Sequence, residues 1–379
     1  MKIGILTLPI AENYGGILQA VALYRLLQTQ GHEVVLVYKQ NANHLALWKK
    51  IVISALVKVP FHDFKGLKSR HRAKQERQER KAFHRPFVEG QILSISKDLF
   101  TKEDLEAFAR EEAFDAVIVG SDQVWRKRYI NDAYYKSYFL DFVDSAKTRK
   151  IAYAASFGKD HWEGEGDAEV IAALLRDFTA VSTREASGVA VCRDTFGYEG
   201  AEHVLDPTLL MDKSFYIDEI ISKHDVSSVP RGGLVTYVLD EADEKRDIIE
   251  AVQAGLHIGS THHLKGFSRS DEICTVPQWL AAFAYADFVV TDSFHGMVFA
   301  ILFEKNFVVI ANHSRGLDRF TSLLSLFGLE DRLVFDPKEM EGKALDRPDY
   351  VRIGRILDEQ RRRSVGFLVD ALGGEALAA

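Results

Sequence analysis

The chain of 379 residues is long enough for two domains, and its 47% hydrophobic and 27% charged residues are ordinary for a globular protein. The net charge of −7 argues against a general nucleic-acid binding surface, so no nucleic-acid partner is expected. The two cysteines, Cys192 and Cys274, stand far apart and outside any CxxC pair, which argues against a disulfide framework and a zinc site. The first apolar run is too short for a signal peptide, and no stretch reaches the length of a membrane span. We therefore expect a cytoplasmic protein without a metal.

The first forty residues predict a unit of strand, loop, helix and strand. Residues 2–8 are apolar and partly β-branched, as in a buried strand, and 17–30 repeat apolar residues at helical spacing until Gly31. A second strand is expected at 33–38. This order of elements favours a parallel sheet.

A basic insertion at 42–86 then interrupts the pattern. It contains twelve Lys or Arg but three Asp or Glu, and its first part is apolar. One interpretation is a helical insertion whose charges face solvent. The other is a basic amphipathic surface that rests on an anionic membrane, which would place the protein at the inner face of the cell membrane.

The remaining chain predicts two sheets that are joined by a linker at 222–233. Further strands are expected at 114–119, 150–155, 179–182, 234–239, 256–260, 287–291 and 307–310, and helices at 241–254, 277–285, 317–326 and 350–372. The expected fold class is α/β, with two Rossmann-like domains that face each other across a cleft. We expect an N-terminal domain at 1–212, a C-terminal domain at 226–345, and a C-terminal helix and tail at 346–379.

Polar residues follow several of the expected strands, at the edge where open α/β sheets bind ligands. The set comprises Asn13, Gly15, Gly16, Ser121, Asp122, Gln123, Ser156, Gly158 and Arg184 in the first half, and Asp292, Ser293 and His295 in the second. If the two sheet edges face each other, these residues line the interdomain cleft.

Each of these features also has a purely structural interpretation. Asn13 with the two glycines fits a tight turn and a helix N-cap, and Asp122 fits a cap of the segment that follows it. Arg184 with Glu185 fits a surface ion pair at the start of a helix. His295 lies in an apolar run and fits a core histidine, whereas its place at a junction of strand and helix favours a functional role.

Six motifs, in their order and spacing, resemble the polysaccharide pyruvyl transferase family. They are Asn13-Tyr14-Gly15-Gly16-x-x-Gln19, Gly120-Ser121-Asp122-Gln123-Val124-Trp125, Ala155-Ser156-Phe157-Gly158, Val181-Ser182-x-Arg184-Glu185, Asp206-Pro207-Thr208 and Thr291-Asp292-Ser293-Phe294-His295-Gly296. The resemblance runs from residue 1 to about residue 330. It implies a fold similar to GT-B glycosyltransferases, phosphoenolpyruvate as the donor, and as acceptor a sugar of a cell-surface polysaccharide or its lipid-linked precursor. It implies no cofactor besides this co-substrate.

The resemblance also carries two functional residues to this chain. The family's arginine after Val-Ser corresponds to Arg184, and its histidine before glycine corresponds to His295. Many relatives have Arg-Leu-His-Gly where this chain has Ser293-Phe294-His295-Gly296. Another cation must therefore replace the arginine that is missing at Ser293, or the donor differs.

The residue types suit this chemistry on their own account. A guanidinium such as that of Arg184 can bind a phosphate or a carboxylate, and helix N-terminal amides at Gly15 and Gly16 or after Ser293 can bind the phosphate. Ketal formation needs an acid for the methylene carbon and a base for the sugar hydroxyl. We expect His295 and Asp122 as the catalytic residues, and as donor-binding residues Arg184, Asn13, Gly15, Gly16, Ser156 and Ser293.

Two other functions stay open. A GT-B glycosyltransferase would use a nucleotide sugar, but the second half contains no recognisable glutamate motif for a ribose. A non-catalytic partner in polysaccharide assembly would keep the fold and lose the site. The presence of Arg184 and His295 argues against that function, whereas the departure at Ser293 favours it.

Overall fold

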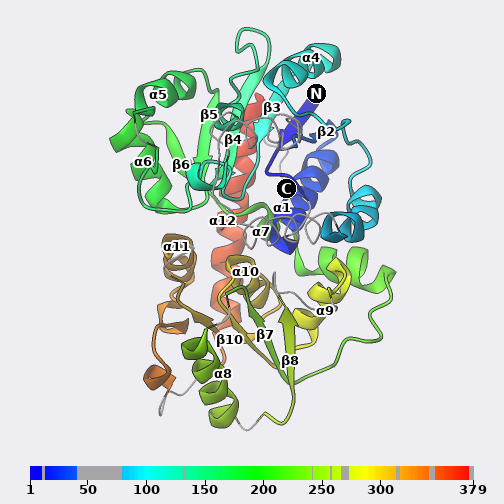
Figure 1. Ribbon diagram of the computed structural model, residues 1–379, viewed down its shortest axis with the longest axis vertical. Coiled ribbons are helices and arrows are strands. Elements are labelled where there is room, and N and C mark those ends of the chain that lie inside the picture. The colour runs from blue at the N-terminus through cyan, green and yellow to red at the C-terminus, as the bar shows by residue number, and fades with distance from the viewer. Residues whose placement is uncertain are drawn as a thin grey trace, which may run out of the picture.

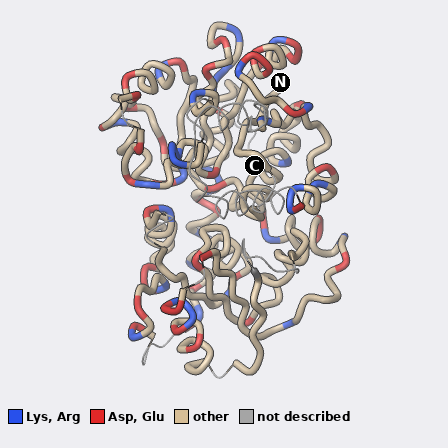
Figure 2. Tube along the Cα trace, viewed as in Figure 1, with Lys and Arg blue, Asp and Glu red and all other residues tan. Residues whose placement is uncertain are grey.

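The computed structural model describes residues 1–10, 13–40, 79–130, 134–164, 166–240, 242–256, 258–265, 273–312, 316–340 and 346–374. Most of the basic insertion expected at 42–86 lies outside the described residues, so its role at a membrane stays a prediction. The described end of the insertion belongs to a helix at 79–91. Lys/Arg and Asp/Glu are scattered over both halves of the described chain (Figure 2). None of the described helices is long and apolar enough to cross a membrane.

Two parallel sheets form the centres of two α/β domains, which lie one above the other in Figure 1. The first sheet has the order β2-β1-β3-β4-β5-β6 and comprises β1 (Lys2–Leu6), β2 (Glu33–Val37), β3 (Ala116–Val119), β4 (Arg149–Ala155), β5 (Ala180–Thr183) and β6 (Ala201–His203). The second has the order β11-β10-β9-β7-β8 and comprises β7 (Leu234–Val238), β8 (Thr261–Lys265), β9 (Phe288–Thr291), β10 (Asn306–Ile310) and β11 (Leu333–Val334). The predicted fold class of two Rossmann-like domains is confirmed.

Helices surround both sheets. They are α1 (Tyr14–Thr29), α4 (Lys102–Glu112), α5 (Ala168–Arg176), α6 (Ala186–Phe196), α7 (Pro207–Leu210), α8 (Asp243–Leu256), α9 (Val276–Tyr285), α10 (Phe294–Leu302), α11 (Asp318–Phe327) and α12 (Tyr350–Leu372). Short helical turns occupy Lys127–Tyr129, Tyr135–Phe139, Phe215–Ile220, Ile221–Lys223, Glu330–Arg332 and Pro337–Met340. Local sequence explains several of the ends: Thr275 and Gln278 form a capping box at the start of α9, and Gly328 ends α11 in a left-handed conformation.

One strand was predicted in the wrong place. The sequence predicts a strand at 256–260, whereas α8 continues to Leu256 and β8 occupies Thr261–Lys265. Leu256 packs against the core beneath α8, so its apolar side chain belongs to the helical stripe. The sequence of β8 contains two adjacent histidines and lacks a long apolar run, which is why the pattern missed it.

The long helix α12 connects the two domains, and the red ribbon in Figure 1 runs from one to the other. Near its start, Arg352 donates to the carbonyl of Phe327 at 2.6 Å, and further along Arg361 donates to the carbonyl of Leu209 at 2.6 Å. One hydrophobic cluster extends from α1 through α7 to α9 and α10, so the two domains share a core.

Candidate functional site

The starts of α1 and α10, one from each domain, meet where the two sheet edges face each other. Asn13 caps α1 by accepting a hydrogen bond from the amide of Gly15, and Ser293 caps α10 by accepting one from the amide of Gly296. The ring of His295 packs directly on Gly15, because a Cβ at that position would lie 2.0 Å from Nδ1 of the histidine. Only glycine permits this approach.

A buried carboxylate, Asp206, lies at the centre of this junction. It follows β6 and accepts hydrogen bonds from the hydroxyl of Ser121 at 2.9 Å and from the amide and hydroxyl of Thr208 at 3.0 and 2.6 Å. Nη1 of Arg184 lies 3.0 Å from the same carboxylate, and Nε2 of His295 lies 3.6 Å from it. Burial alone would raise the pKa of Asp206, but His295, Arg184 and Thr208 together lower it well below its ordinary value.

Arg184 lies immediately after β5 and is buried, which excludes the interpretation as a surface ion pair. Besides the bond to Asp206, its Nε lies 3.6 Å from Glu185 and its Nη2 lies 3.7 Å from Asp122. Its guanidinium carbon lies 4.4 Å from the ring centroid of Phe294. Nε and Nη2 are buried and have no hydrogen-bond partner in the described chain. Each of these nitrogen atoms thus keeps donor capacity while it faces a carboxylate beyond hydrogen-bond distance.

Asp122, the expected base, adopts a left-handed backbone conformation with φ of 72°. Its carbonyl accepts hydrogen bonds from the amides of Val124 at 2.7 Å and Ser156 at 3.1 Å, which fix this turn beside β4. The turn aims the carboxylate at Arg184 and toward Gly16, where a Cβ would lie 3.5 Å from Oδ2. Non-glycine residues in this region are uncommon and concentrate at functional sites.

Ser156 has a different environment from the one expected. Its hydroxyl donates to Glu185 and accepts from the amide of Gly158 at 3.1 Å, so it holds a carboxylate in place. Burial raises the pKa of Glu185 despite the positive charge of Arg184 beside it. The side chain of Ser293 is likewise occupied by its cap of α10.

A second guanidinium reaches the same junction from the C-terminal domain. Arg319, near the start of α11, is 6% exposed, and its guanidinium carbon lies 5.7 Å from the ring centroid of Phe294. Burial and the charge of Arg184 lower the pKa of Arg319 to about 10. The sequence pattern does not point to Arg319, because this residue lies in the first turn of a helix and not at the end of a strand. The available signal was a single arginine among the apolar residues of α11.

The other predicted aspartate, Asp292, belongs to a separate cluster at the edge of the second sheet. Its carboxylate accepts from Lys245 Nζ at 2.6 Å, from the amide of Leu239 at 2.6 Å and from Asn312 Nδ2 at 3.2 Å. Its strong bonds to α8 and to two loops indicate a structural role.

The two domains are in close contact around the site. Gly316 approaches Gly158 so closely that a Cβ would lie 2.0 Å from the carbonyl oxygen of Gly158. The amide of Ala186 donates to the hydroxyl of Ser322 at 2.9 Å, and Tyr14 donates to the carbonyl of Cys274 at 2.8 Å. The structure therefore brings Asn13, Gly15, Gly16, Asp122, Arg184 and His295 together, with Ser156 and Ser293 in supporting positions.

Comparisons with known proteins indicate a family and a fold. A family model described as polysaccharide pyruvyl transferase matches residues 13–314. No curated protein matches the sequence. Among solved structures, UDP-GlcNAc 2-epimerase from Methanocaldococcus jannaschii has 11% identity and a TM-score of 0.53, covering 95% of this chain and 100% of its own. UDP-GlcNAc 2-epimerase from Neisseria meningitidis bound to UDP-GlcNAc has 7% identity and a TM-score of 0.51, covering 98% of this chain and 99% of its own. These similarities concern the GT-B type of fold alone.

Proposed function

We propose, on the premise that the chain belongs to the polysaccharide pyruvyl transferase family, that it transfers pyruvate from phosphoenolpyruvate to a glycan. The acceptor is a sugar of a cell-surface polysaccharide or of its lipid-linked precursor, and the product is a pyruvate ketal. The observation that carries the proposal is the buried junction at which Arg184 and Asp206 of the first domain meet His295 of the second.

The donor carries a phosphate and a carboxylate, and two guanidiniums suit these two anions. Arg184 offers Nε and Nη2, which have no hydrogen-bond partner in the described chain. Arg319 lies beside the same phenylalanine and comes from the domain that also contributes Ser293. We propose that Arg319 supplies the second cation, in place of the arginine that many relatives have at the position of Ser293.

The reaction begins with a proton that His295 delivers to the methylene carbon of the donor. The donor carbon that bears the phosphate then becomes oxocarbenium-like and is attacked by a sugar hydroxyl. Phosphate leaves with the electrons of its C–O bond, and a second hydroxyl closes the ketal and passes its proton to the departing phosphate. The carboxylate of Asp206 lies 3.6 Å from Nε2 and orients the ring of His295. Asp122 takes the proton of the first sugar hydroxyl as it attacks. This scheme uses no metal and no further cofactor.

The test is a direct assay of the reaction. The protein is incubated with phosphoenolpyruvate and with lipid-linked or nucleotide-linked glycans, and phosphate release is measured together with the mass of the glycan. We expect phosphate and a glycan that has gained a pyruvate ketal in equal amounts. Phosphate release without a change in the glycan, or sugar transfer from a nucleotide sugar, would contradict the proposal and favour the glycosyltransferase alternative.

A further inference from the structure

The phenyl ring of Phe294 lies where the two domains meet. Phe294 is the first residue of α10, directly before His295, and it is 4% exposed. Its ring packs edge-on against the ring of His295 with 5.3 Å between the centroids, and against the ring of Phe320 with 6.3 Å between them. Because the ring is buried and packed against two others, its orientation is fixed.

Two guanidiniums, one from each domain, lie near this ring. The guanidinium carbon of Arg184, in the first domain, lies 4.4 Å from the ring centroid of Phe294, and that of Arg319, in the second domain, lies 5.7 Å from it. Both are within the distance of about 6 Å at which an aromatic ring attracts a cation, and this attraction is stronger where water is excluded. A leucine at position 294 would have the apolar bulk without the negative face of the ring.

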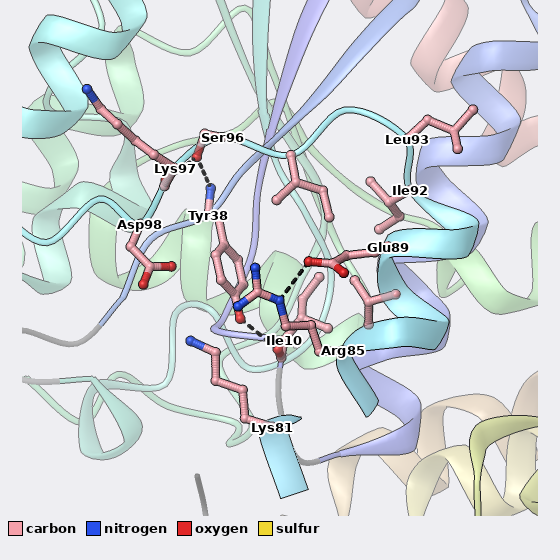
Figure 3. A pocket seen from close by; sticks show the side chains of 12 residues that line it. Ile10, Tyr38, Lys81, Arg85, Glu89, Ile92, Leu93, Ser96, Lys97 and Asp98 are labelled. Carbon is pink, nitrogen blue, oxygen red and sulfur yellow. Dashed lines mark hydrogen bonds and ion pairs between the residues drawn. The ribbon is translucent and has the colours of Figure 1, made fainter. Parts of the chain in front are cut away.

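Cation–π pairs in other parts of the described chain lie within one domain. The ammonium of Lys81 lies 4.9 Å from the ring centroid of Tyr38, both in the first domain (Figure 3). The guanidinium carbon of Arg231 lies 4.0 Å from the ring centroid of Tyr285, both in the second. Phe294 differs from these rings because the cations near it come from both domains.

The two guanidiniums near Phe294 repel each other. Burial and the charge of Arg184 lower the pKa of Arg319 to about 10, against the opposing attraction of Glu185 and Asp122. The same two carboxylates lie 3.6 and 3.7 Å from Nε and Nη2 of Arg184, beyond hydrogen-bond distance. An anion bound by both guanidiniums relieves their repulsion, and phosphoenolpyruvate carries two anionic groups.

The motif that contains Phe294 departs from that of many relatives at two neighbouring positions. They have arginine and leucine where this chain has Ser293 and Phe294, and the hydroxyl of Ser293 is occupied as the cap of α10. We propose that Phe294 is a positioning residue of the donor site, an inference that rests on the proposed function. Its ring holds Arg184 and Arg319 together, so that an aromatic face and a cation from α11 replace the arginine of those relatives.

The test measures the binding of phosphoenolpyruvate to the full-length protein by calorimetry. Phe294→Leu keeps an apolar side chain but removes the ring, and it should weaken binding about tenfold, as should Arg319→Gln. Because the ring acts through Arg319, the two losses should not add in the double variant. Ser293→Arg combined with Phe294→Leu restores the pattern of many relatives and should recover most of the affinity.

The matched control is Tyr285→Leu, which removes a ring that also lies beside a guanidinium, that of Arg231. Tyr285 ends α9, and its carbonyl accepts from the amide of Gly232 just before β7, at the edge of the second sheet opposite His295. We expect unchanged binding of phosphoenolpyruvate in this variant. Circular dichroism shows whether each variant is folded.

Unchanged binding in Phe294→Leu would overturn the positioning role, and so would a loss that adds to that of Arg319→Gln. Weak binding by a folded Ser293→Arg, Phe294→Leu variant, or no binding by the parent protein, would overturn it as well. Because the calorimetry contains no acceptor, its result is independent of the pyruvyl transfer reaction. Donor binding that depends on Phe294 in a protein that forms no ketal would support the positioning role and contradict the proposed function. Ketal formation with an unchanged donor KM in Phe294→Leu would do the opposite.

Discussion

Two aspartates, one at the edge of each sheet, are equally buried but differ in what surrounds them. Asp292 binds Lys245 and Asn312, and neither of these partners has a buried polar atom without a hydrogen bond. Asp206 binds Arg184 and lies beside His295, and both of these retain buried nitrogen atoms that make no hydrogen bond in the described chain. Such atoms cost free energy unless a ligand or water completes them. We therefore expect the Asp206 cluster to bind a ligand and the Asp292 cluster to stabilise the fold.

The largest effect should come from His295. His295→Ala should reduce turnover by about 10²- to 10⁴-fold, the usual contribution of a general acid, while donor affinity changes less. His295→Gln keeps hydrogen bonding without proton transfer and should be nearly as inactive. The measurement is steady-state phosphate release, and the control is His161→Gln, which changes an exposed histidine. High activity in the glutamine variant would leave His295 a positioning role and make Asp122 the next residue to test.

The next effect concerns the Asp292 cluster and should appear in the stability of the protein instead of its activity. Asp292→Asn leaves Lys245 without its ion pair and should lower the free energy of unfolding by roughly 3 kcal/mol. Denaturant titration followed by circular dichroism measures this loss. Asp212→Asn removes an exposed aspartate that is paired with Arg361 and should cost far less. If Asp292→Asn instead abolishes turnover at unchanged stability, the distinction between the two clusters is wrong.

A smaller effect is expected for Arg184→Lys. Lysine keeps the charge but loses the planar arrangement of donors, so the affinity for phosphoenolpyruvate should fall about tenfold, roughly 1.4 kcal/mol. Calorimetric titration with the donor measures it. Arg193→Lys, at an exposed pair with Asp194, is the matched control. Unchanged donor binding in Arg184→Ala would remove Arg184 from the donor site.

The fold and the first-domain site could be predicted because their signals are local. Strands such as Phe288–Thr291 are short apolar runs, and Arg184 lies directly after a strand, where α/β folds place ligand contacts. Arg319 and Asp206 could not be assigned in this way. Arg319 reaches the site from a helix of the other domain. Asp206 belongs to one of the six motifs, but nothing in that motif indicates that it lies against both Arg184 and His295. Contacts between domains depend on packing, which a single sequence does not encode locally.

The smallest effect is a dependence of stability on pH that the Asp206 cluster should show. The pKa of Asp206 is lowered below its ordinary value of 3.8 in the folded protein, because its bonds to Arg184, His295 and Thr208 outweigh burial. A carboxyl whose pKa falls on folding contributes stability that is complete above its unfolded pKa and is lost as pH falls through the folded pKa. Asp206→Asn should therefore be less stable than the parent protein at pH 6, and the difference should shrink as the pH falls below about 4. Unfolding free energies measured by denaturant titration between pH 6 and pH 3 test this. A difference that stays constant over this range would show that Asp206 contributes through shape and hydrogen bonding alone, without the charge that the binding cluster requires.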